Sequence, residues 1–113
     1  MQFLLIVAHD YAFAPTEDLV GGIMSWIKHM TDQGVRIEGR PLRPASEATT
    51  LRIRYGQLQR VASTFSDSAE QMCGFELVEC RDLEHAVEVA RQHPMAAAAT
   101  IEVRPIWSSL GDN

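Results

Sequence analysis

The sequence is poor in the features that mark several large functional classes of protein. Lys28 is its only lysine and its nine arginines are scattered, whereas nucleic acid and anionic membranes are bound by clustered Lys and Arg. Acidic residues outnumber basic residues by fifteen to ten, which gives a net charge of -5. We therefore expect neither nucleic acid nor a membrane as the main partner.

Cysteines and long apolar runs are also scarce. Cys73 and Cys80 are the only cysteines. On one strand they would lie about 23 Å apart, well beyond the ~7 Å between Cα atoms that a disulfide allows. The apolar run Phe3–Ala8 has no basic segment before it, and His9-Asp10 ends it too early for an export signal or a membrane span. These features predict a cytoplasmic protein with reduced cysteines.

The length of the chain limits its organisation. With 113 residues and 12.6 kDa, we expect residues 1–113 to form one domain with one modest core. Hydrophobic residues make up 46% and charged residues 22%, which is typical of a globular protein and excludes a disordered one. The size also excludes an enzyme with a separate cofactor domain.

Hydrophobic spacing predicts an alternation of strands and helices. Gly34 should end the first helix in a left-handed cap, Asp82 should cap the second, and Pro94 should end it. Two strands at 51–61 should form a hairpin with Gly56-Gln57 as its turn. The other expected elements are a strand at 3–8, a helix from Pro15, a strand at 35–40, a strand at 75–80, a helix after residue 82 and a strand at 100–106.

This order predicts an α+β fold, a ferredoxin-like antiparallel sheet with two helices on one face. The strand Phe3–Ala8 is apolar on both of its faces, so both faces require cover. Two helices cover one face only. We therefore expect a homodimer in which a second copy packs sheet against sheet.

Several segments resemble the YCII-related superfamily, and in particular its DGPF-domain branch. The two strongest are EQMCGFEL at residues 70–77 and IEVRPI at residues 101–106. Further matches are Gly34-Val35, Gly39–Leu42, Thr49–Arg52 and Ala90–Pro94. One segment departs from the pattern, because Ala62-Ser63-Thr64-Phe65 stands where that branch carries Asp-Gly-Pro-Phe.

The resemblance implies a dimeric α+β barrel and says less about activity, since most of the family is uncharacterised. YCII-type relatives carry a proposed His-Asp pair near the end of the first strand, and one is a dehydrochlorinase. DGPF-type relatives often have Gly-Asp there, and they are suspected of accompanying sigma factors. The altered loop at residues 62–65 lacks the branch's aspartate, so no role of that residue is carried over.

His9 and Asp10 are the candidate catalytic residues. They follow a rigid apolar strand, where side chains can project into a cleft. Histidine moves protons near neutral pH, and a carboxylate can orient its ring or stabilise its cation. Neighbours on an extended strand point to opposite faces, so Asp10 can orient His9 only if the chain turns there. The alternative for His9 is an exposed loop histidine.

Three further residues are candidates to line a pocket. His93 lies before Pro94, and its alternative role is to cap the second helix as a cation. Phe65 is expected to anchor its loop with a buried ring. Glu102 is expected either in the barrel cavity or in an ion pair with Arg104, which shares its strand face.

No metal or other cofactor is expected, because the sequence contains no HxxxH or CxxC spacing. Two functions remain open. One is a cofactor-independent enzyme that performs proton transfer, elimination or isomerisation on a small organic molecule. The other is a non-catalytic dimer that binds a small ligand or a protein partner and has a regulatory role.

Overall fold

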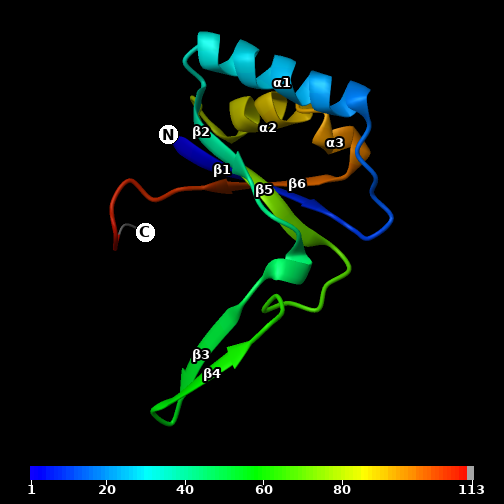
Figure 1. Cartoon of the computed structure of the whole chain (residues 1–113). Helices are drawn as coiled ribbons and strands as arrows, with labels where there is room; N and C mark the ends of the chain where they lie inside the picture. The colour runs from blue at the N-terminus through cyan, green and yellow to red at the C-terminus, as the bar shows by residue number, and fades with distance from the viewer. Residues whose placement is uncertain (112–113) are drawn as a thin grey trace.

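The apolar N-terminal segment forms the centre of the sheet in the computed structural model, which describes residues 1–111 (Figure 1). This strand, β1 (Gln2–His9), pairs antiparallel with β5 (Gln71–Glu79) on one side and with β6 (Thr100–Pro105) on the other. The strand β2 (Arg36–Pro41) pairs with β5 and completes the order β2-β5-β1-β6. This arrangement confirms the predicted ferredoxin-like α+β fold.

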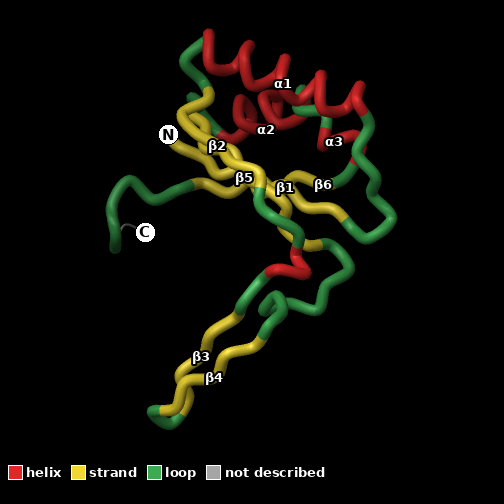
Figure 2. Tube along the Cα trace, viewed as in Figure 1, coloured by secondary structure: helices red, strands yellow, loops and turns green. Residues whose placement is uncertain are grey.

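The helices lie together on one face of this sheet (Figure 2). They are α1 (Glu17–Asp32), α2 (Leu83–Arg91) and the short α3 (Met95–Ala98). The Thr16 hydroxyl caps α1 by accepting the N–H of Leu19 at 3.1 Å. A helix is stabilised when a side chain accepts one of its free N–H groups in this way.

The helix boundaries agree with the sequence at most points. Gly34 has a φ of 72°, so it ends α1 in the left-handed conformation as predicted. The start of α1 differs, because Thr16 takes the capping position and Pro15 lies before the helix instead of within it. The turn α3, which follows Pro94, was not predicted.

The core lies between the sheet and the helices. Phe3 and Leu5 point toward the helices from β1, and Val78 does so from β5. The other members of this cluster are Trp26, Met30, Val35, Cys80, Ala86, Val89 and Ala90. Trp26 is fixed within it because its indole N–H donates to the Val89 carbonyl at 3.0 Å.

The opposite sheet face, here called the open face, carries no helix of the described chain. Leu4 and Ile6 of β1 lie on it beside their β5 partners Leu77 and Phe75, and all four are partly exposed. An apolar stripe therefore runs along the middle of this face. This agrees with the expectation that β1 is apolar on both sides.

A second sheet, here called the arm, extends from the domain on the side away from the helices (Figure 1). It is a hairpin of β3 (Thr50–Arg54) and β4 (Gln57–Val61), and the short 3₁₀ helix η1 (Ala45–Glu47) precedes it. The turn residues are Tyr55 and Gly56, with φ values of 54° and 75°. A two-residue type I′ turn needs positive φ at both positions, so the predicted turn at Gly56-Gln57 was one residue late.

The strand β5 begins four residues before the predicted start at Phe75. Its first residue is the polar Gln71 and its fourth is Gly74, but Gln71 and Met72 pair with His9 and Ala8 at the end of β1. The backbone N–H and C=O groups at the end of β1 need hydrogen-bond partners, and β5 supplies them by extending beyond its apolar part. Within residues 1–111, no helix has both the length and the apolar character needed to cross a membrane.

Candidate functional site

His9 is the last residue of β1, and its ring is held in a defined orientation. Its Nδ1 lies 2.8 Å from the backbone carbonyl oxygen of Asp10. A carbonyl can only accept, so Nδ1 carries the proton and the neutral ring keeps its lone pair on Nε2. The ring also stacks on Phe13, with centroids 4.5 Å apart and planes at 25°. His9 is thus prepared to accept a proton at one named atom.

Asp10 begins a tight turn directly after the strand. Its Oδ1 accepts the N–H of Ala12 at 3.0 Å, and its carbonyl accepts the N–H of Phe13 at 3.3 Å. The chain therefore turns where the sequence argument required it. The group that orients His9 is the backbone carbonyl of Asp10, however, because the carboxylate is held in the turn.

A cavity of about 350 Å³ connects this strand end with two other segments. Glu70, from the loop before β5, lies in its wall, and Thr100 at the start of β6 donates its hydroxyl to Glu70 Oε1 at 2.5 Å. The remaining lining residues are His9, Asp10, Ala12, Phe13, Ala98 and Ala99. The structure thus places a fixed imidazole and two carboxyl groups around one polar cavity.

Glu70 is a site residue that sequence reasoning did not select. In the sequence it is the first residue of the EQMCGFEL segment, and it lies outside every strand and helix that the spacing predicts. It shares a cavity with His9 because β5 runs antiparallel to β1 and its neighbour Gln71 pairs with His9. A β-bulge between Val7 and Ala8 shifts that register by one residue. The position of Glu70 at the start of the best-matching segment was the available signal.

His93 lies in the core, apart from this cavity. It is buried beside Trp26, with ring centroids 4.6 Å apart, and its Nδ1 accepts the N–H of Met95 at 3.1 Å. Burial lowers the pKa of His93 to about 4, because the charged ring would lose its hydration. The expected cationic cap of α2 was therefore wrong: the ring is neutral and caps the turn that begins α3.

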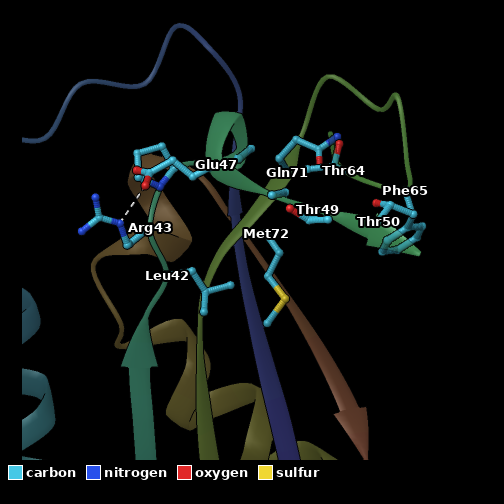
Figure 3. Close-up of a pocket in the computed structure, with 12 residues that line it drawn as sticks. Leu42, Arg43, Glu47, Thr49, Thr50, Thr64, Phe65, Gln71 and Met72 are labelled. Atoms are coloured by element: carbon cyan, nitrogen blue, oxygen red, sulfur yellow. Dashed lines mark hydrogen bonds and ion pairs between the residues drawn. The ribbon is translucent and has the colours of Figure 1, made fainter. Parts of the chain in front are cut away.

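Phe65 does not have the buried ring that was expected, since its side chain is 82% exposed. It lines a second cavity of about 330 Å³ at the root of the arm, together with Leu42, Thr50 and Met72 (Figure 3). The loop 62–70 lies at the root of the arm, away from the helices that cover the core (Figure 1), so the ring of Phe65 is not packed into that core.

Glu102 lies on the open face of β6, opposite Ile6. Its Oε2 is 3.6 Å from Nε of Arg104, and both side chains are exposed. Glu102 is therefore in the ion pair that was its alternative role, and it is not brought to the cavity of His9. Among residues 1–111, no three His, Cys, Asp or Glu side chains converge to hold a metal ion.

Comparison with known proteins identifies a family and a similar curated protein. The family model described as the YCII-related domain matches residues 1–109. An uncharacterised protein from Rhizobium meliloti (strain 1021) is 36% identical over 65 residues, which are 56% of this chain and 52% of that protein. The chain thus spans about half the length of this curated relative.

Proposed function

The chain belongs to the YCII-related domain family, and we propose that it is an enzyme that transfers a proton on a small organic molecule without a cofactor. The observation that carries this proposal is the fixed ring of His9 beside Asp10 and Glu70 in one cavity. A neutral imidazole with a defined acceptor nitrogen is a suitable general base near neutral pH.

The chemistry follows from the charges around the ring. When His9 Nε2 takes a proton from substrate carbon, the imidazolium forms in the same cavity as the carboxyl groups of Asp10 and Glu70, which favour a cation. In an elimination, the C–H electron pair becomes the new double bond as the leaving group departs. In an isomerisation, the proton returns to another atom. Ala12, Ala98 and Ala99 in the wall leave space for the substrate.

The proposal also includes a cytoplasmic homodimer of the DGPF branch. The apolar stripe on the open face supports the dimer, because a second copy would cover it. Free thiols at Cys73 and Cys80 support a reducing compartment. The EQMCGFEL segment that contains Glu70 supports the branch.

The alternative is a dimer that binds a small ligand without converting it, as a regulatory accessory protein. The cavity at the root of the arm favours this alternative. Its charged lining residues, Arg43 and Glu47, are paired with each other at 2.9 Å. Around them the wall is largely aliphatic or hydroxylic, so this cavity can hold a ligand and offers no free acid or base.

The experiment begins with a thermal-shift screen of small organic acids, lactones and halogenated compounds against the purified chain, because a ligand that binds the folded state raises its Tm. Any hit is incubated in D₂O, and solvent deuterium entering the compound is measured by NMR together with turnover. His9→Ala should lower both rates by about 10² to 10⁴ while leaving the Tm nearly unchanged. Glu70→Gln should lower them as well.

The matched control is His29→Ala, which removes an exposed histidine from α1 and should leave both rates unchanged. Turnover that survives His9→Ala would refute the catalytic assignment. A hit that binds without exchange or turnover, and whose binding is lost in Phe65→Ala but kept in His9→Ala, would support the alternative.

A further inference from the structure

The arm has one apolar face and one polar face. In the register of β3 and β4, Ile53 lies opposite Leu58 and Leu51 lies opposite Arg60, so these four side chains share one face. The other face carries Thr50, Arg52, Arg54, Gln57, Gln59 and Val61. On the apolar face Leu51 is 59%, Ile53 67% and Leu58 64% exposed. Aliphatic residues at alternate positions are typical of a strand face that is covered in the working protein.

The arm is not stabilised by its own strands alone. An isolated two-stranded hairpin is at best marginally stable in water, and in the described chain β3 pairs with β4 and with no other strand. Its root, in contrast, is firmly held. The Thr50 hydroxyl donates to the Ser63 carbonyl at 2.7 Å, and Gln71 Nε2 donates to the carbonyls of Ser66 and Ser68 at 2.8 Å each. The arm is therefore held in one direction, away from the helices.

The charge of the arm indicates what can cover it. Arg60 lies on the apolar face and Arg52 and Arg54 lie on the polar face, so the hairpin as a whole carries three positive charges. Residues 48–66 contain no acid. The remainder of the chain then holds fifteen acidic and seven basic side chains. The basic arm and the acidic body are thus electrostatically complementary, and a second copy of this chain supplies the missing acidic surface.

The arm and the open face are placed so that one partner can cover both. Leu51, Ile53 and Leu58 are each more than half exposed, and the open face lies on the same side of the sheet as the arm (Figure 1). A stable interface takes about 800 Å² from each partner, so a second copy would have to cover the arm and the open face together. In a dimer with two-fold symmetry this contact occurs twice, because the arm of each copy packs against the other copy.

We propose that the arm of each protomer packs against a second copy of this chain. In this dimer Leu51, Ile53 and Leu58 contact the partner's surface, and Arg60 lies near the partner's acidic side chains. This inference rests on the proposed homodimer and is independent of the proposed chemistry. It assigns the arm to the interface in addition to the open face.

The test compares two variants of the full chain that add the same charge to opposite faces of the arm. Ile53→Glu places a carboxylate on the apolar face, and Gln59→Glu places one on the polar face. Both side chains are exposed in the protomer, so neither change should unfold it. By analytical ultracentrifugation, Ile53→Glu should raise the dimer Kd about 100-fold or more, and Gln59→Glu should change it less than about threefold.

A second measurement is amide hydrogen exchange over residues 50–61 in the wild-type dimer. Exchange in the arm should slow as the protein concentration rises through the Kd, because docking removes the hairpin from solvent. Arm amides that exchange equally fast in monomer and dimer would overturn the inference.

The outcomes separate this inference from the proposed dimer. Leu77→Glu alters the open face instead of the arm. A dimer that Leu77→Glu dissociates and Ile53→Glu leaves intact would refute the role of the arm and keep the sheet-to-sheet dimer. A wild-type protein that sediments as a 12.6 kDa species at 100 μM would overturn both. Neither result bears on whether His9 transfers a proton.

Discussion

Acid should destabilise this protein through His93 in particular. The ring is buried against Trp26, and burial lowers its pKa from 6.5 to about 4. The unfolded chain takes up a proton near pH 6.5, while the folded state resists it until about pH 4. The contribution of neutral His93 to the free energy of unfolding is therefore complete above pH 6.5, and it is lost as the pH falls toward 4.

The size of this effect follows from the displacement of the pKa. Each pKa unit corresponds to 1.36 kcal/mol, so the lowered pKa of His93 corresponds to about 3 kcal/mol of unfolding free energy between pH 7 and pH 4. Other groups titrate in the same range, so the wild type alone cannot isolate this contribution. A variant without the imidazole removes it and keeps the others.

His93→Asn is the suitable variant, because the asparagine oxygen can still accept the N–H of Met95. At pH 7 it should be about 1–2 kcal/mol less stable than the wild type, since the smaller side chain leaves space beside Trp26. At pH 4 that deficit should shrink or reverse, with a total change of about 3 kcal/mol. Urea unfolding at one fixed protein concentration measures both values.

The matched control is His29→Asn, which replaces an exposed histidine and should follow the wild type at both pH values. If the stability difference between His93→Asn and the wild type were the same at pH 7 and pH 4, the buried neutral state of His93 would be refuted.

Two further substitutions test local features of the fold by the same urea measurement. In Gly39→Ala the new Cβ would collide with the Glu76 carboxylate, which is paired with Arg36 at 2.6 Å. Because the collision would separate this pair, the free energy of unfolding should fall by about 3 kcal/mol. With Glu76→Ala already present, Gly39→Ala should cost less than about 1 kcal/mol, and equal costs in both backgrounds would contradict the collision. Asp82→Ala should cost about 1 kcal/mol, because Asp82 Oδ1 accepts the N–H of His85 at 2.8 Å at the start of α2. Asp82→Ser should restore most of that loss, and a serine variant as unstable as the alanine variant would exclude the cap.

The candidate site shows how far sequence reasoning reached. His9 and Asp10 were selected because they follow directly after an apolar strand, and the structure places both at one cavity. Glu70 was not selected, because its distance from His9 depends on strand register across 61 residues of chain and on a bulge in that register. His93 was expected to line a pocket or to cap α2, and its burial was missed because Trp26, which packs against it, comes from a helix distant in the sequence.

The sequence by itself determined the elements whose signals are local. The strand β1, the cap at Asp82 and the left-handed residue Gly34 each depend on side chains within a few positions, so spacing and residue type are sufficient. Tertiary structure alone decided which side chains meet and which stay exposed. It grouped Glu70 with His9, buried His93, and left Phe65 on the surface at the root of the arm. The physical reason is that burial and pKa depend on neighbours brought together by strand register and helix packing, and a local pattern contains no information about those neighbours.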